Sequence, residues 1–347
     1  MENKRNFGID LLRMVSMTFI VIMHLLGQGG VIGASGVGPN VGTAAWVLEI
    51  CAFCAVNIYA LISGYVGADS KFKLSRLIVL WLEVVFYTVL ITAVVSFIKP
   101  EAITEWSWTN AFLPVSNSQY WYITAYFGMS LFAPLINLGV KNASKRLVLV
   151  LCFIDVIAFM VVPCFMQIDV FNMKSGYSML WLLILYFFGA AIKKLELDKK
   201  VSPWISAFTY IFSSFLTWML FRGGNSYLIN YISPLMFTAA LGIVTFFAGL
   251  DIKTKPAKAI IALLSPGSLA VYLIHVHPLI WDNYVKGIAV PYVNHGWFVM
   301  VLSVIGTACA AYIVGALFDR LRILLFDLIG LKKLFSKLDD FLFTEKN

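Results

Sequence analysis

Ten stretches of about 20 mainly apolar residues follow one another along the chain, and short polar segments separate them. They lie near 7–27, 44–66, 76–98, 119–138, 146–166, 177–193, 203–221, 229–249, 264–285 and 297–318. Stretches of this length form helices that cross the hydrocarbon core of a bilayer. They are too continuous for membrane-barrel strands, which alternate over about ten residues. The pattern predicts an all-α polytopic integral membrane protein with about ten transmembrane helices.

The lysines and arginines divide the predicted loops into two sets. One set of alternate loops, together with both termini, holds 21 of the 26 basic residues: Lys4, Arg5, Lys71, Lys73, Arg76, Lys141, Lys145, Arg146, Lys193, Lys194, Lys199, Lys200, Lys253, Lys255, Lys258, Arg320, Arg322, Lys332, Lys333, Lys337 and Lys346. The opposite set holds Lys99, Lys174, Arg222 and Lys286, and Arg13 lies inside the first span. Because cytoplasmic loops are enriched in lysine and arginine, both termini are predicted to be cytoplasmic.

Composition agrees with this class. The 347 residues are 61% hydrophobic and 13% charged, whereas soluble domains carry about 25% charged residues. The net charge of +8 follows from the topology, so we expect membrane lipids as partners and no nucleic acid. Residues 1–318 should form one ten-helix membrane domain, and residues 319–347 a cytoplasmic amphipathic tail.

The first predicted helix, "NFGIDLLRMVSMTFIVIMHLLG", carries Asp10, Arg13 and His24. Arg13 and His24 are three turns plus about 20° apart, which places them on one helix face roughly 16 Å from each other. Asp10 lies one turn before Arg13 on nearly the same stripe. Ionisable residues at membrane depth usually face a cavity and mark a functional path. The alternative is that Arg13 reaches the inner interface beside Asp10 while His24 bonds a neighbouring helix.

Four segments of the sequence resemble the acyltransferase-3 family of membrane acyltransferases. They are "IDLLRMVSMTFIVIMH", in which ten residues separate the arginine from the histidine, "IYALISGYVGADSKFKLSRLIVLWLEVVFYTV", "QYWYITAYFGMSLFAPLIN" and "SLAVYLIHVHPLI". With the ten-span topology, this likeness covers nearly the whole chain. Some family members carry an added extracellular hydrolase-like domain, and none is expected within these residues.

The resemblance implies an enzyme of the bacterial cytoplasmic (plasma) membrane that moves an acyl group, commonly acetyl, from cytoplasmic acyl-coenzyme A to a glycan hydroxyl. The glycan would be extracytoplasmic or lipid-linked. The residues suit this role: Arg13, with Arg76 and Lys73 at the mouth, could hold the phosphates of the donor. His24 could act as general base or accept the acyl group itself. Asp10 could orient Arg13.

Other polar residues are candidates for substrate contacts. Ser63 could line a channel for the donor, although a small residue there also permits close helix packing. Glu49 near the external end of the second span could meet a sugar hydroxyl. Trp121 and Tyr122 open the fourth span, where an aromatic belt is common and a sugar platform is the sharper interpretation. His275 matches the family's late segment and is expected to line the site.

Two further placements follow from helical spacing. His275 and His277 are two residues apart, roughly 200° around a helix, so no metal site is expected there. Glu83 follows Arg76 by seven positions, which places the two on similar helix faces and favours an ion pair.

Two other functions fit the same pattern. A transporter or flippase could use the buried charges to carry a proton or bind a solute. A structural partner in a glycan-assembly complex would share the topology but leave Arg13 and His24 without a role. The acceptor glycan, the length of the acyl chain, and the choice between a homo-oligomer and a glycan-assembly partner stay open.

Overall fold

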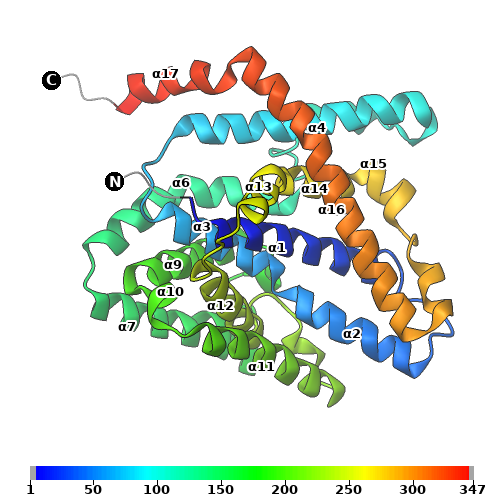
Figure 1. Ribbon diagram of the computed structural model, residues 1–347, viewed down its shortest axis with the longest axis horizontal. Coiled ribbons are helices and arrows are strands. Elements are labelled where there is room, and N and C mark those ends of the chain that lie inside the picture. The colour runs from blue at the N-terminus through cyan, green and yellow to red at the C-terminus, as the bar shows by residue number, and fades with distance from the viewer. Residues whose placement is uncertain (1–4, 344–347) are drawn as a thin grey trace.

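The computed structural model describes residues 5–343, and these form helices and turns without a strand (Figure 1). Lys4 and Lys346 of the predicted cytoplasmic set lie outside this range. The helices are α1 (Phe7–Leu26), α2 (Pro39–Phe53), α3 (Ala55–Gly67), α4 (Leu74–Ile98), α5 (Glu105–Phe112), α6 (Trp121–Asn142), α7 (Lys145–Val156), α8 (Val162–Met166), α9 (Met179–Leu195), α10 (Leu197–Lys200), α11 (Pro203–Arg222), α12 (Pro234–Ala248), α13 (Lys255–Leu264), α14 (Ser268–His275), α15 (Pro278–Ile280), α16 (Gly296–Ile329) and α17 (Leu331–Phe343).

Each of the ten predicted apolar segments contains a helix, and the one predicted at 264–285 is interrupted between His275 and Pro278. Within residues 5–343, eight helical segments are long and apolar enough to cross a membrane: Phe7–Leu26, Pro39–Gly67, Leu74–Ile98, Trp121–Asn142, Lys145–Met166, Pro203–Arg222, Lys255–His275 and Pro278–Ile329. The other two predicted spans correspond to α9, of 17 residues, and α12, of 15 residues. The prediction of an all-α polytopic membrane protein is confirmed.

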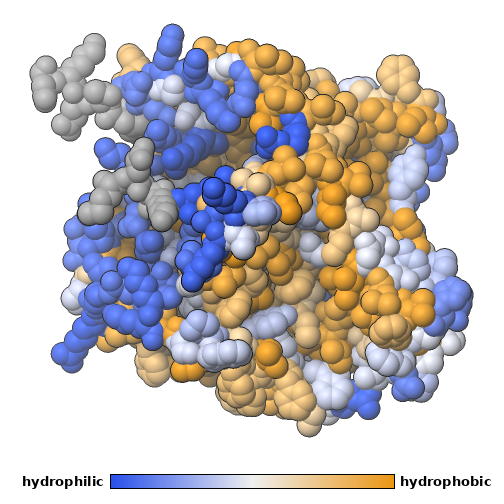
Figure 2. All heavy atoms as spheres, in the orientation of Figure 1, coloured by the Kyte–Doolittle hydropathy of each residue, from blue (hydrophilic) through white to orange (hydrophobic). Residues whose placement is uncertain are grey.

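Helix α1 lies in the interior of the bundle, where it packs against α2, α3, α12, α14 and α16 (Figure 1). Peripheral helices instead turn large apolar side chains outward, and Phe97, Phe165, Trp204 and Leu328 are each at least 84% exposed. Figure 2 shows that hydrophilic and hydrophobic residues are separated on the surface. Hydrophilic residues gather on the left of this view, and hydrophobic residues cover the middle. This surface suits a bilayer whose cytoplasmic face meets the basic side.

Helices α3 and α9 approach each other closely at two glycines. A Cβ atom on Gly64 would lie 1.9 Å from the carbonyl oxygen of Tyr186, and one on Gly189 would lie 2.1 Å from that of Leu61. Both neighbours are backbone atoms, which cannot rotate away. Small residues therefore set the distance between these helices, as is common inside membranes.

Replacing Gly64 with valine should push α3 away from α9. We expect the free energy of unfolding to fall by about 1–3 kcal/mol, which is typical of overpacking. Thermal unfolding of the detergent-solubilised chain measures this. Gly306→Val is the matched control, because a Cβ atom on Gly306 meets nothing within 4 Å. Equal melting temperatures for the two variants would contradict the packing argument.

A buried ionic cluster joins α4 to the C-terminal part of α16. Arg322 donates to both carboxylate oxygens of Asp319, at 2.6 and 2.9 Å, and its Nη2 lies 3.3 Å from Oε1 of Glu83. The Tyr87 hydroxyl donates to Asp319 at 2.7 Å. The predicted pair between Arg76 and Glu83 is therefore wrong. A partner 239 residues further along the chain replaces the one that helical spacing suggested.

The C-terminal part of the chain folds back along α4. Helix α16 continues through residue 318, where a boundary was predicted, and the chain turns only at Gly330, whose φ of +74° suits glycine. Helix α17 then packs against α4. Asp339 accepts hydrogen bonds from the Ser75 hydroxyl and from the Ser75 amide, the latter at 3.0 Å, in the first turn of α4. The hydroxyl bond is the main cause that holds the pKa of Asp339 below its usual value.

Candidate active site

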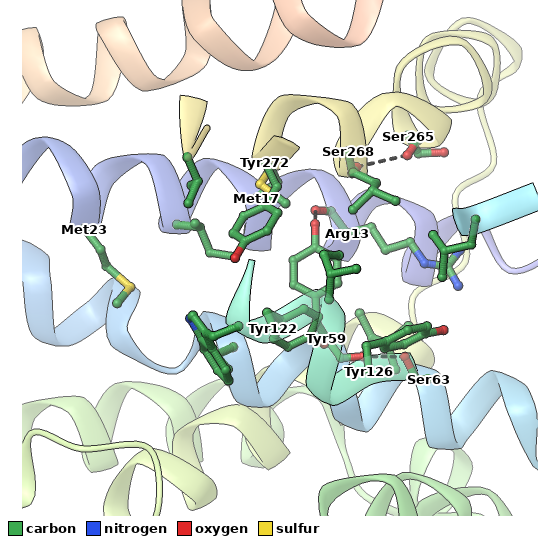
Figure 3. Close-up of a pocket in the computed structure, with 18 of the residues that line it drawn as sticks. Arg13, Met17, Met23, Tyr59, Ser63, Tyr122, Tyr126, Ser265, Ser268 and Tyr272 are labelled. Atoms are coloured by element: carbon green, nitrogen blue, oxygen red, sulfur yellow. Dashed lines mark hydrogen bonds between the residues drawn. The ribbon is translucent and has the colours of Figure 1, made fainter. Parts of the chain in front are cut away.

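A cavity of about 580 Å³ lies between α1, α3, α6 and α14, and Figure 3 shows Arg13 in its wall. His24, at the other end of the predicted stripe, also lines it. Its walls are formed by Arg5, Asp10, Arg13, Met17, Ile20, Met23, His24, Val56, Tyr59, Ile62, Ser63, Leu80, Trp121, Tyr122, Ile123, Tyr126, Tyr177, Tyr231, Ser265, Pro266, Ser268, Leu269, Tyr272 and Val276. Because α1 is unbroken from Phe7 to Leu26, Arg13 and His24 stand roughly 16 Å apart along the axis.

Two arginines share one carboxylate at the end of the cavity nearest the start of α1. Asp10, whose side chain is 8% exposed, lies 2.5 Å from Nε of Arg5 and 2.6 Å from Nη1 of Arg13. Arg5 also donates to the Ser265 hydroxyl at 3.3 Å. Within residues 5–343, Asp10 is the one side chain to which the Arg13 guanidinium donates, so donors of Arg13 stay available to a ligand. The predicted contact between Asp10 and Arg13 is present.

Arg5 is not among the predicted site residues, because its position depends on how α1 begins. Asn6 caps that helix: its side-chain oxygen accepts from the Ile9 amide at 3.1 Å, and its amide nitrogen donates to Ala248 of α12 at 2.9 Å. The residue before this cap is thereby held beside the first turn. An asparagine just before an apolar run is the sequence signal for such a cap.

A smaller hollow of about 220 Å³ adjoins the cavity at its Arg13 end. It shares Arg13, Ser63 and Tyr126 with the cavity, and we call it the basic vestibule because Lys71, Lys73 and Arg76 also line it. The structure thus brings Lys73 and Arg76 to the mouth beside Arg13, while Ser63 lies where the two spaces meet. The Ser63 hydroxyl donates to the Tyr59 carbonyl oxygen of the same helix at 2.8 Å.

At the outer end of the cavity His24 meets His275, which was expected to line the site but is not part of the cavity wall. Nδ1 of His24 lies 2.9 Å from Nε2 of His275, and Nδ1 of His275 lies 2.6 Å from the Val271 carbonyl oxygen. The indole of Trp281 meets the His24 ring edge-on, with centroids 4.9 Å apart. The structure therefore brings His275 to His24, 251 residues away in the chain.

This chain of contacts fixes the tautomer of His24. A carbonyl oxygen can only accept, so Nδ1 of His275 carries the proton and donates to Val271. In the neutral ring, Nε2 of His275 is then an acceptor, and Nδ1 of His24 must donate to it. Nε2 of neutral His24 is left with its lone pair free. A nitrogen in this state can remove a proton from a hydroxyl group.

Aromatic side chains line the outer half of the cavity. Trp121 and Tyr122, both predicted, lie in its wall together with Tyr272 (Figure 3 shows the two tyrosines). The buried hydroxyls of Tyr122 and Tyr272 have no hydrogen-bond partner in the described part of the chain. Glu49, predicted to meet a sugar, is instead buried on α2 and is not part of the cavity wall.

Several cavity residues carry no local signal in the sequence. Tyr59 donates to the Arg13 carbonyl oxygen at 2.6 Å and so joins α3 to α1 beside the arginine pair. Tyr177 and Tyr231 come from segments between helices and pack together, with ring centroids 5.0 Å apart. Across residues 5–343, no group of three His, Cys, Asp or Glu side chains is arranged to hold a metal ion.

Fold and site together define a multi-pass membrane protein whose interior cavity joins a basic mouth to a buried histidine pair. The chain belongs to the acyltransferase-3 family: the family's profile, described as an acyltransferase domain, matches residues 6–316. It is therefore a membrane acyltransferase. Comparisons with curated proteins and with solved structures gave no match.

Proposed function

We propose that this membrane acyltransferase takes an acyl group, acetyl in the simplest case, from cytoplasmic acyl-coenzyme A. It delivers this group to a hydroxyl of an extracytoplasmic or lipid-linked glycan, in a bacterial cytoplasmic membrane. The observation that supports this most strongly is that one cavity contains both Arg13 at its basic end and His24 at its outer end. A donor with an anionic head and a reactive group on a long arm fits such a space.

The basic vestibule and the arginine pair suit the phosphates of coenzyme A. Lys71, Lys73 and Arg76 line the vestibule, and Arg13 belongs to both spaces. Guanidinium groups bind phosphate through charge-assisted, often bidentate hydrogen bonds. Beyond Arg13 the wall becomes apolar, which suits the uncharged arm that carries the thioester.

At the outer end, His24 would act as general base. Its free Nε2 takes the proton of the acceptor hydroxyl while the hydroxyl oxygen attacks the thioester carbonyl carbon. The carbon–sulfur bond then breaks, and the thiolate of coenzyme A leaves and receives the proton from His24. The products are an O-acyl ester and free coenzyme A. The unpartnered hydroxyls of Tyr122 and Tyr272 are donors of the kind that stabilise the oxyanion formed in this attack.

Coenzyme A binding tests the donor half of the proposal. Isothermal titration of coenzyme A into the 347-residue chain in nanodiscs should give an affinity that falls as salt rises, because phosphates meet cations. Arg13→Ala should weaken binding about tenfold, which corresponds to the loss of one charge-assisted contact.

Arg146→Ala is the matched control, since Arg146 is exposed and lines neither the cavity nor the basic vestibule. It should bind coenzyme A as the unmodified chain does. Unchanged binding in Arg13→Ala, or equal losses in both variants, would remove Arg13 from the donor site.

A further inference from the structure

A hollow of about 350 Å³ lies on the opposite side of the bundle from the basic vestibule. We call it the outer pocket; its polar lining includes Thr92, Ser107, Asn110, Gln119, His277 and Asn283. Helix α4 contributes Arg76 to the vestibule and Thr92 to the outer pocket, and these residues are roughly 24 Å apart along a continuous helix. By the charge distribution of the loops, the outer pocket faces the extracytoplasmic side.

His277 presents a hydrogen-bond donor at this pocket. Its Nδ1 accepts from the Leu279 amide at 3.2 Å, so in the neutral ring the proton lies on Nε2. The residue is 2% exposed, and Nε2 has no partner among the described residues. A buried N–H without a partner is costly. A ligand oxygen in the pocket would satisfy it.

Acceptors lie in the same lining. Oε1 of Gln119 is buried without a partner in residues 5–343, and so is the hydroxyl of Thr92, a residue that is 1% exposed. The pocket therefore offers an unused donor, an unused acceptor and a hydroxyl that can be either. A ligand hydroxyl group, which donates and accepts at once, matches this set.

Two of the remaining polar side chains, Asn283 and Asn110, are held in place by their own hydrogen bonds. Asn283 accepts from the Lys99 ammonium and donates to the Leu279 carbonyl oxygen, both at 2.8 Å. Asn110 accepts from Asn117 at 2.9 Å. Besides one carboxylate, that of Asp282, the polar lining consists of amides, hydroxyls and the His277 imidazole, so the site favours an uncharged, hydroxyl-rich molecule over an anion.

The outer pocket adjoins the histidine pair. The chain leaves α14 at His275, which contacts His24, and two residues later His277 lines the outer pocket. Trp281 contacts His24, and the next residue, Asp282, lines the outer pocket. One short segment therefore serves both places, so a molecule bound in the pocket lies next to the site of acyl transfer.

We propose that the outer pocket binds a neutral sugar unit of the acceptor glycan, beside the catalytic cavity and separate from it. For the class of acceptor, this inference rests on the proposed function. Binding at this pocket positions the glycan without taking part in the chemistry at His24.

Saturation-transfer NMR with two neutral oligosaccharides, chitotetraose and maltotetraose, tests this on the nanodisc-embedded chain. At least one should show transfer to its ring protons. Gln119→Met, which keeps the side-chain length but removes the acceptor, should reduce that signal at least fivefold. Gln28→Met is the matched control, because Gln28 is exposed and does not line the outer pocket. Thr92→Val, nearly isosteric, should also reduce the signal.

A role confined to folding predicts a different pattern. Since Gln119→Met and Thr92→Val remove buried polar atoms without partners, their melting temperatures should not fall while sugar binding does. The pocket assignment is overturned if neither sugar shows transfer, or if both variants retain the full signal. His24→Ala should keep sugar binding. Sugar binding that depends on Gln119 in a chain that cleaves no thioester would retain the pocket and refute the acyl-coenzyme A proposal.

Discussion

His24→Ala is expected to lower acyl transfer about 10²- to 10⁴-fold, the range attributed to a lost general base. A hydrogen-bond chain, through His275 to the Val271 carbonyl oxygen, fixes which nitrogen of the His24 imidazole is free. Release of the coenzyme A thiol from acetyl-coenzyme A, in membrane vesicles that contain the chain and surface glycan, measures the rate.

His295→Ala is the matched control, because His295 is exposed and lies outside the cavity wall. It should turn over acetyl-coenzyme A normally, and His24→Ala should still bind coenzyme A, since Arg13 and the basic vestibule are intact. Full activity in His24→Ala would refute the base role. Thioester cleavage absent from the unmodified chain as well would favour the transporter or flippase alternative.

Local periodicity predicted the features that lie within one helix. Asp10, Arg13 and His24 share one cavity because α1 is a straight, continuous helix, so spacing at 3.6 residues per turn translates directly into a common face. The apolar segments likewise became helices, because a bilayer forces the backbone to satisfy itself. Loop charge placed Lys73 and Arg76 on the side where Arg13 was expected.

Contacts between different helices could not be predicted from the spacing of residues within one helix. The partner of Glu83 is Arg322 rather than Arg76, since only the packing of α16 against α4 determines which cation arrives. Glu49 was expected at the substrate, but the packing of α2 buries it away from the cavity wall. Boundaries also shifted: the span predicted at 177–193 is helical from Met179 to Leu195, because the Ser178 side chain accepts from the Trp181 amide and caps the start of α9.

The pairing of His24 with His275 is the part of the site that geometry adds to the sequence. His275 was expected to line the site because it matches a family segment. That resemblance did not predict which residue His275 would contact. The structure places it to orient His24: it accepts from Nδ1 of His24 at 2.9 Å and so leaves the lone pair of the ring on Nε2. Its role is thus comparable to that of the group that orients the base in hydrolase triads.

His275→Leu should therefore reduce kcat about 10²-fold, because the base loses its fixed tautomer and orientation. The KM for acetyl-coenzyme A should stay unchanged, since we propose that the donor head binds in the basic vestibule, which His275 does not line. His275→Gln should recover much of the rate, because its amide oxygen can accept from Nδ1 of His24 where the imidazole nitrogen did. Steady-state kinetics of thiol release measures both constants.

The two His275 variants separate orientation from mere packing. Leucine fills the space without an acceptor, and glutamine supplies an acceptor with a different shape; a structural role would make the two behave alike. His295→Leu controls for the substitution itself at an exposed position. If Leu and Gln at 275 lose the same activity, or if KM rises with kcat unchanged, His275 contacts substrate or only supports the fold. Recovery by glutamine alone follows only if the hydrogen bond to His24 sets the direction in which its free nitrogen points.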